Sequence, residues 1–261
     1  MNLSASALPL LMLCSAPAHD TVKKEKDRGS PSARFGTAVH AVLEQRVKQG
    51  ADLFDLDQEV AIACDLHDVS PDESWRMAEC AKNAIAEIDN LEANRTFVLL
   101  PEVKFAVDVE TGDARVLNSK DARDYSDAKP TEIVGTADLV VTENNGSVCW
   151  VVDYKTGSSP AHDYDEQMRF LAFAALKVYR PMTGVVHGSC WQLTPIDRTA
   201  TDVAIASDAT ADAYLERLRQ LYRDATAEPK YQPGQHCKER WCKARKTCKA
   251  YANAVNEGLI L

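Results

Sequence analysis

The chain lacks the features of several large classes of protein. None of its 261 residues belongs to an apolar run long enough to cross a membrane. It has no Gly-x-x-x-x-Gly-Lys-Ser/Thr segment, so no P-loop motor is built into it. It also has no internal repeat and no low-complexity tract. With 45% hydrophobic residues the chain can bury a full core, and we expect a single α/β domain over residues 1–261.

Three charged residues stand in or at the end of two strand-like runs. Asp138 lies within the run 133–141, and Asp153 and Lys155 close the run 148–155, with a turn-forming segment, 143–146, between the runs. Side chains alternate along a strand, so Asp153 and Lys155 share a face, and a hairpin partner can bring Asp138 beside them. Buried charges need a partner, and a divalent cation is the natural one. An ordinary ion pair between Asp153 and Lys155 is the alternative.

The surroundings of these charges form a recognisable order of motifs. Gly135-Thr-Ala-Asp138 precedes Asp153-Tyr-Lys-Thr-Gly157, and the helix predicted to follow carries Gln167. In this order and spacing, residues 97–179 resemble the PD-(D/E)XK nucleases, and in particular their RecB-like branch. The resemblance implies an α/β fold with a restriction-endonuclease-like core over about 35–195, in which helices flank a central mixed sheet.

The resemblance assigns the charged residues to metal-dependent phosphodiester hydrolysis. Hard oxygen ligands suit Mg²⁺ or Mn²⁺, which bind phosphate oxygens and lower the pKa of a coordinated water. Asp138 and Asp153 would hold the ion, with the backbone carbonyl of Tyr154 as a third ligand. Lys155, whose pKa falls when it is desolvated, would orient or deprotonate the attacking water.

Three further positions match the same family pattern. His40 lies near the edge of the buried stripe of a predicted helix, where a histidine is ordinarily a core residue. Its segment is similar to the Gly-x-x-x-His helix of RecB-like nucleases, which implies a metal ligand. Glu102 matches a glutamate common before the Gly-x-x-Asp strand, or is a strand-edge charge. Gln167 would position substrate or the metal-bound water, although Leu171 replaces the tyrosine that the family has four residues later.

A second group of residues is a set of clustered cysteines. Cys237, Cys242 and Cys248 lie within one short polar segment, and Cys14 supplies a fourth thiol near the N-terminus. The arrangement is similar to RecB-like nucleases in which one N-terminal and three C-terminal cysteines bind a 4Fe-4S cluster. Four residues separate Cys237 from Cys242, where that group has two, and structural Zn²⁺ is the alternative. The remaining four cysteines are expected to be small buried hydrophobes: Cys64, Cys80, Cys149 and Cys190.

The chain is acidic, with a formal net charge of -9, which at first sight opposes a nucleic-acid partner. Binding depends on local potential, however, and two segments are rich in basic residues. These residues are Lys23, Lys24, Lys26, Arg28 and Arg34 in one segment, and Lys238, Arg240, Lys243, Arg245, Lys246 and Lys249 in the other. They indicate two DNA-attracting patches, or ordinary solvated surface.

The resemblance favours a DNA exonuclease that acts at single strands or duplex ends, in recombination, repair or phage DNA metabolism. The alternatives are a structure-specific or restriction-type endonuclease and a non-catalytic DNA-binding subunit. The acidic total suggests a loading partner such as a recombinase, a helicase or a single-strand binding protein. Clustered metal-type cysteines indicate a reducing compartment, so we expect the cytoplasm of a bacterial or phage-infected cell, without membrane association.

Hydrophobic periodicity and turn residues predict nine elements. Helices are expected near 4–14, 35–49, 71–92, 162–179 and 208–227, and strands near 96–109, 132–142, 147–155 and 182–194. The polar stretch 111–130 is expected to be a surface excursion between strands.

Overall fold

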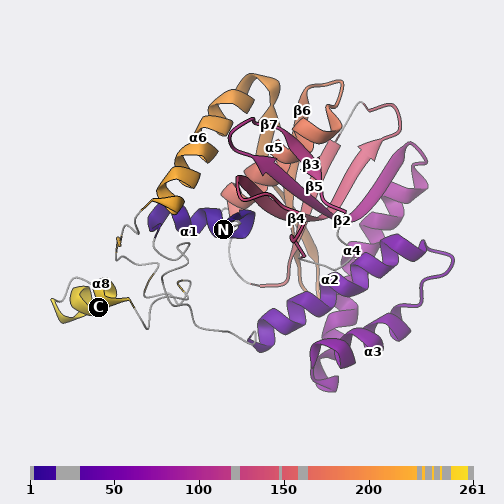
Figure 1. Ribbon diagram of the computed structural model, residues 1–261. Coiled ribbons are helices and arrows are strands. Elements are labelled where there is room, and N and C mark those ends of the chain that lie inside the picture. The colour runs from indigo at the N-terminus through magenta and orange to yellow at the C-terminus, as the bar shows by residue number, and fades with distance from the viewer. Residues whose placement is uncertain are drawn as a thin grey trace.

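The computed structural model describes most of the chain (Figure 1). The described residues are 3–15, 30–118, 124–146, 149–157, 164–227, 231–232, 237, 242 and 248–257. Within these ranges, none of the helices combines the length and the apolarity that crossing a lipid bilayer requires.

A mixed sheet of seven strands forms the centre of the fold. Its strands are β1 (Leu3–Ser4), β2 (Phe97–Asp108), β3 (Ala114–Val116), β4 (Glu132–Glu143), β5 (Cys149–Lys155), β6 (Val185–Leu193) and β7 (Arg198–Ser207). The order is β3-β2-β4-β5-β6-β7, and β1 pairs with β4 outside this path. The pairs β5–β6 and β1–β4 are parallel and the others are antiparallel. This architecture confirms the predicted α/β class with a central mixed sheet.

Helices cover both faces of the sheet (Figure 1). One face packs against α2 (Pro31–Gln49) and α4 (Ser74–Ala93), with α3 (Leu56–His67) outside them. The other face packs against α5 (Asp165–Tyr179), which also contacts α1 (Leu8–Leu13) and α6 (Asp208–Thr226). The remaining elements are two short 3-10 helices, Ala5–Ala7 and Pro71–Glu73, and α8 (Lys249–Asn256). Two hydrophobic layers therefore enclose the central strands.

Most predicted elements are found. The five expected helices and four expected strands correspond to the 3-10 helix Ala5–Ala7 with α1, to α2, α4, α5 and α6, and to β2, β4, β5 and β6. The helices α3 and α8 and the strands β1 and β7 were not predicted, and the expected excursion 111–130 contains β3. Phe170 and Phe173 lie in the core, as do Cys64, Cys80, Cys149 and Cys190. The helix α3 and the strand β7 each have a strongly exposed side, so apolar periodicity is weak there.

A buried arginine fixes α2 to α4. Arg46 is only 1% exposed, although it carries a charge. Its Nη2 lies 2.5 Å from Oδ1 of Asp89 and 2.6 Å from Oε2 of Glu92, both on α4. Loss of these carboxylates would leave a buried guanidinium unpaired, which would lower the free energy of unfolding by about 3–5 kcal/mol. The pair therefore holds α2, the helix that carries His40, at a defined place over the sheet.

Close packing explains the glycine of the Gly-x-x-Asp strand. A Cβ atom on Gly135 would lie 2.8 Å from Cβ of Ala5, 3.0 Å from Phe170 and 3.1 Å from Leu171. Ala5 directly follows β1, whose Leu3 pairs with Ile133, while Phe170 and Leu171 belong to α5. The absent side chain therefore lets the N-terminal segment and α5 pack directly on β4.

Replacing Gly135 with Ala should destabilise the protein by about 1–3 kcal/mol, because the added methyl group overpacks a core that cannot shift easily. Urea unfolding measures this loss. Gly157→Ala is the matched control, since a Cβ there meets nothing within 4 Å, and should change stability by less than about 0.5 kcal/mol. An equal loss in the two variants would show that contact with Ala5 and α5 is not the reason for glycine at position 135.

Candidate functional site

The strands β2 and β4 change the phase of their side-chain alternation at the same level. In β2, Phe97 and Leu99 face the α2 layer, whereas Val103, Phe105 and Val107 face the α5 layer, although all five positions are odd-numbered. Strand β4 does the same, with Ala137 on the α5 side and Leu139 on the α2 side. The register between them runs from Pro101–Leu139 to Val103–Ala137 and skips Glu102 and Asp138. The two skipped residues are both acidic.

The backbone of Glu102 produces the change in β2. Its φ is 50°, in the left-handed region that non-glycine residues rarely adopt. Such a conformation costs of order 1–3 kcal/mol and persists only where the surrounding structure enforces it. Here it turns the Glu102 carboxylate out of the strand alternation and toward Asp138.

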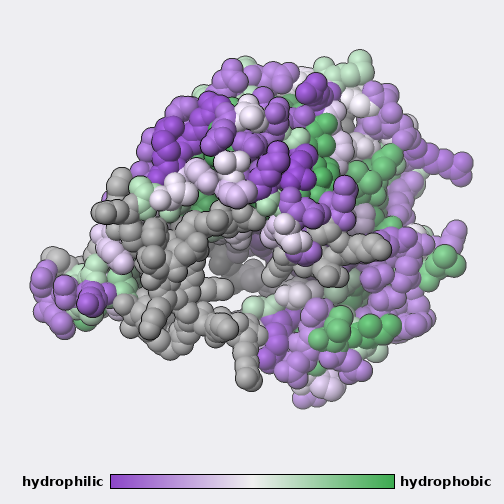
Figure 2. All heavy atoms as spheres, viewed as in Figure 1, coloured by the Kyte–Doolittle hydropathy of each residue, from purple (hydrophilic) through white to green (hydrophobic). Residues whose placement is uncertain are grey.

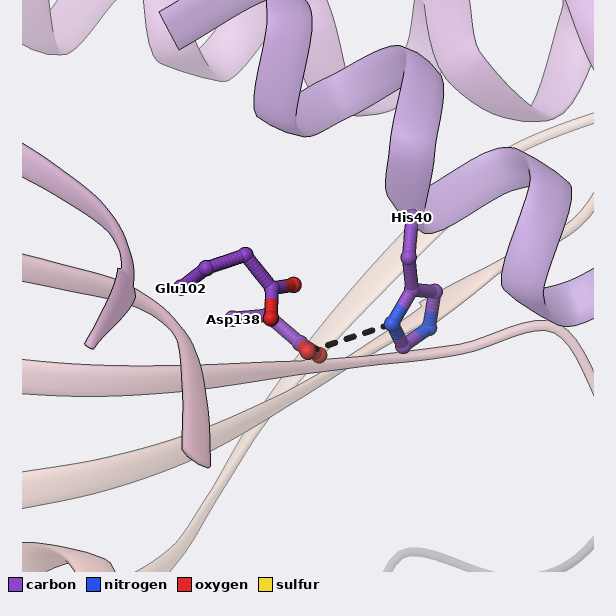
Figure 3. Close-up of side chains that lie close together, drawn as sticks. All are labelled: His40, Glu102 and Asp138. Carbon is purple, nitrogen blue, oxygen red and sulfur yellow. Dashed lines mark hydrogen bonds and ion pairs between the residues drawn. The ribbon is translucent and has the colours of Figure 1, made fainter. Parts of the chain in front are cut away.

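Three side chains from three elements meet at this level (Figure 3). His40 of α2, Glu102 of β2 and Asp138 of β4 each bring a ligand atom within 4.8 Å of the others. Nδ1 of His40 and Oδ1 of Asp138 are 3.1 Å apart in a hydrogen bond. We call these three residues the α2-side cluster. One imidazole and two carboxylates form a donor set that fits a divalent cation such as Mg²⁺ or Mn²⁺.

Asp138 lies at the point where β4 stops pairing with β5. The β4–β5 pairing ends at Leu139–Val152, and the β1–β4 pairing covers only Ile133 and Val134. Within the described strands, residues 135–138 therefore have no ladder partner on this side. Oδ2 of Asp138 instead accepts a hydrogen bond from the backbone N–H of Tyr154, at 2.5 Å. The carboxylate thus bridges the two diverging strands.

The end of β5 presents a second group of side chains toward α5. Nζ of Lys155 is in direct ionic contact with Oδ2 of Asp153 and lies 4.3 Å from the centre of the Tyr164 ring. Oδ1 of Asp153 accepts a hydrogen bond from Nε2 of Gln167, at 3.0 Å. We call Asp153, Lys155, Tyr164 and Gln167 the α5-side cluster. The sequence did not predict the role of Tyr164, and no motif marks that residue.

Electrostatic coupling joins the two clusters. Burial by itself would raise the pKa of Asp138, but His40, the Lys155 charge and the Tyr154 N–H lower it overall. The pKa of Asp153 is raised, because burial and the neighbouring Asp138 charge outweigh the opposing effect of Lys155. Two carboxylates of the same residue type are thus pushed in opposite directions, a pattern that marks functional sites.

The pKa values of the two basic groups, Lys155 and His40, are both raised. Burial would lower the pKa of Lys155, but the carboxylates of Asp153 and Asp138 raise it overall. The net shift of the Lys155 pKa is therefore upward, opposite to the fall expected from desolvation, since the two carboxylates outweigh burial. Burial would also lower the pKa of His40, and the charge and hydrogen bond of Asp138 raise it.

Within the described part of the chain, none of the proposed cluster cysteines forms a disulfide. Cys14, Cys237 and Cys242 are buried, and Cys248 is half-buried. The backbone N–H of Gln232 donates a hydrogen bond to Sγ of Cys14, at 3.5 Å, so the N-terminal segment touches the chain just before Cys237. The structure describes only Arg34 and Lys249 of the two basic segments, and their other basic residues lie outside the described ranges. Arg34 lies 3.6 Å from Asp68.

Substitutions of the strained Glu102 test its roles in metal binding and in stability separately. Glu102→Ala and Glu102→Gly both remove the carboxylate and should weaken Mn²⁺ binding, measured by calorimetry. Glycine tolerates a positive φ, so the Gly variant should be more stable than the Ala variant by about 1 kcal/mol in urea unfolding.

Asp68, with φ 52° at the end of α3, is the matched control. Its Gly and Ala variants should show the same difference in stability and leave Mn²⁺ binding unchanged. Wild-type Mn²⁺ affinity in the Glu102 variants would remove Glu102 from the metal site.

Comparisons with known proteins place the chain in a family. A model of the PD-(D/E)XK nuclease superfamily matches residues 2–249. No curated protein matches the chain. Among solved structures it is similar to one described as "Crystal structure of SSO0001", at 17% sequence identity and a TM-score of 0.37, with 82% of this chain and 85% of that chain covered. On the extent of the family match, the chain belongs to the PD-(D/E)XK nuclease superfamily.

Proposed function

We propose that this protein is a metal-dependent deoxyribonuclease that hydrolyses phosphodiester bonds at DNA ends. The observation that carries the proposal is the meeting of Asp138, Asp153 and Lys155 where β4 and β5 diverge. Asp138 accepts the backbone N–H of Tyr154, the residue between Asp153 and Lys155, and those two residues are in direct ionic contact. Superfamily membership supplies the nuclease chemistry. The preference for DNA ends over internal sites comes from the resemblance to RecB-like exonucleases.

The metal would be held where the two clusters adjoin. Asp138, with His40 and Glu102, offers the donor set already described, and Asp153 and the Tyr154 carbonyl complete the ligands that we propose. When bound, Mg²⁺ or Mn²⁺ supplies Lewis-acid polarisation of a phosphate oxygen and lowers the pKa of a bound water. A cation would also relieve the repulsion between Asp138 and Asp153, which are buried close together.

Lys155 would supply positive charge to the reacting phosphate. Its side chain is 18% exposed, and its ammonium group is held between Asp153 and the Tyr164 ring, so its position is set before substrate arrives. A preorganised charge in a partly dry site stabilises developing negative charge without reorganisation. Gln167 donates to Oδ1 of Asp153 and orients that carboxylate. The chain itself thus contributes a fixed cation and two oriented carboxylates.

Cleavage of matched substrates tests this function. With Mn²⁺, the wild-type protein should shorten linear single-stranded DNA or duplex ends progressively and leave covalently closed circles intact. Lys155→Ala should reduce cleavage by about 10²–10³-fold, because it removes the preorganised cation. Lys177→Ala is the control. It removes a lysine of α5, on the same face of the sheet, and should retain full activity.

Opening of the covalently closed circles would mean that the protein is an endonuclease and not an exonuclease. If the protein binds DNA but cleaves none of these substrates, it is a non-catalytic DNA-binding subunit. Cleavage that survives in Lys155→Ala would overturn the proposed mechanism itself.

We further propose that Cys14, Cys237, Cys242 and Cys248 bind a 4Fe-4S cluster that joins the two ends of the chain. Thiolate ligands suit iron-sulfur clusters and zinc. The hydrogen bond from Gln232 to Cys14 supports the pairing of an N-terminal cysteine with the C-terminal segment. The role is structural, since none of the four cysteines belongs to the α2-side or α5-side cluster.

Protein purified without oxygen should be brown and contain iron and sulfide. Cys242→Ser should lose the visible absorption and unfold at a lower temperature. Cys190→Ala is the control, because burial raises the pKa of that thiol to about 12 and keeps it inert. Stoichiometric zinc without iron would instead assign these thiols to a structural Zn²⁺ site.

DNA is the macromolecular partner that this proposal requires. A loading protein such as a recombinase, a helicase or a single-strand binding protein would compensate for the net charge of -9, which repels DNA over much of the surface. Action on DNA inside a bacterial or phage-infected cell places the protein in the cytoplasm under this proposal.

A further inference from the structure

The first turn of α5 touches both charged residues at the end of β5. The ring of Tyr164 lies under Nζ of Lys155, and Nε2 of Gln167 donates to Asp153. Tyr164 directly precedes α5 and Gln167 is the third residue of that helix, so the N-terminal end of α5 places both. The place of this one turn therefore sets both contacts at once.

Glu166 lies within the same turn and points toward α6 instead. Its Oε1 accepts a hydrogen bond from Nε of Arg217 at 3.1 Å, and its Oε2 accepts one from Nη2 at 3.0 Å. The hydroxyl of Tyr214 donates to Oε1 at 3.3 Å. The Glu166 side chain is only 7% exposed. The Arg217 side chain is 42% exposed, and its bidentate contact with the buried carboxylate leaves little freedom in distance or angle.

The partners of Glu166 are themselves fixed. Burial and the Glu166 charge raise the pKa of Tyr214 far above its ordinary range, so its hydroxyl remains a neutral donor. The Tyr214 ring also packs 5.3 Å from Phe173 of α5. Nη2 of Arg217 lies 3.2 Å from Sδ of Met12, which brings α1 into the same contact. Three helices therefore meet at one buried carboxylate.

The helix α6 suits this purpose because it packs through one side only. Ala211, Leu215, Leu218 and Ala225 are buried, while the outward face of α6 is hydrophilic (Figure 2). Arg217 and Tyr214 lie beside the buried stripe and reach α5 from there. The other arginines of α6 make different contacts. Arg223, for example, binds Glu216 within α6 itself, at 2.8 Å.

We propose that Glu166, Arg217 and Tyr214 form an anchor that positions Gln167 and Tyr164 against Asp153 and Lys155. The inference rests on the proposed nuclease function and adds three positioning residues to it. None of the three belongs to the α2-side or α5-side cluster. They act through the first turn of α5, whose displacement would loosen the orientation of Asp153 and the placement of the Lys155 charge together.

Arg217→Met tests the anchor, because it keeps the length of the side chain and removes both donors. We expect its kcat for linear DNA to fall by about 10–100-fold, since a displacement of about 1 Å near reacting groups can cost 10²-fold. Its KM for DNA should stay within about twofold, because α6 is not proposed to contact substrate. Arg217→Lys should recover part of the loss. Arg223→Met on the same helix is the matched control and should behave as wild type.

A mutant cycle shows whether Arg217 acts through Tyr164 and Gln167. If it does, adding Arg217→Met to a variant that already carries Tyr164→Leu and Gln167→Ala should slow cleavage by no more than about twofold further. Effects that multiply would overturn the anchor, because they would mean that Arg217 affects activity by a separate route. An Arg217→Met variant that matches Arg223→Met in kcat would overturn it as well.

Hydrogen exchange in the full chain provides a readout that is independent of cleavage. Amides of residues 168–171, the first that can donate within α5, should exchange at least about tenfold faster in Arg217→Met than in Arg223→Met, while α2 amides keep their protection. Unchanged exchange at 168–171 would contradict the anchor even in an active enzyme. If the wild-type protein never cleaves DNA and Arg217→Met still speeds this exchange, the failure lies in the proposed function and not in the anchor.

Discussion

The site depends on the separation of β4 from β5 after the pair Leu139–Val152. A continued ladder would use the backbone N–H of Tyr154 in strand pairing and would leave no space between the strands. Here the carboxylate of Asp138 accepts that N–H, so the buried backbone donor remains satisfied although the strands have separated. One side chain thus closes the end of the ladder and opens the position at which His40, Glu102, Asp153 and Lys155 converge.

Charge burial follows from this geometry. Asp138 and Asp153 are 9% and 3% exposed, so water cannot screen their repulsion well. Lys155 and His40 compensate for part of it, and each gains a higher pKa in doing so. The helix α2, which carries His40, is held by the contact of the buried Arg46 with Glu92 of α4. The helix α5, whose Gln167 contacts Asp153, is held by the contact of its buried Glu166 with Arg217. Ion pairs outside the site therefore stabilise the positions of the helices that surround its buried, mutually repelling carboxylates.

Much of the fold was predictable because it follows local patterns. The runs that became β4 and β5, the helix that carries His40, and the separation of Asp153 and Lys155 by one residue all follow from periodicity. The phase change in β2 was not predictable, since Phe97, Leu99, Val103, Phe105 and Val107 read as one uninterrupted alternation. Only the positive φ of Glu102 places the two halves of that series on opposite faces. Tyr164 was missed for a related reason, because a cation–π contact across a chain reversal leaves no spacing rule in the sequence.

The short strand β1 has a consequence for how the chain folds as it is made. Leu3 and Ser4 are synthesised before the other strands of the sheet, and their partners Ile133 and Val134 follow about 130 residues later. Parallel contacts over such a separation form slowly, since a long loop must close before they yield any stabilisation. The apolar residues that follow β1, Leu8 among them, therefore remain without their final neighbours while the intervening residues are made. A nascent chain with this topology relies on late docking of the β1 segment, and a chaperone that shields these apolar residues would favour correct assembly.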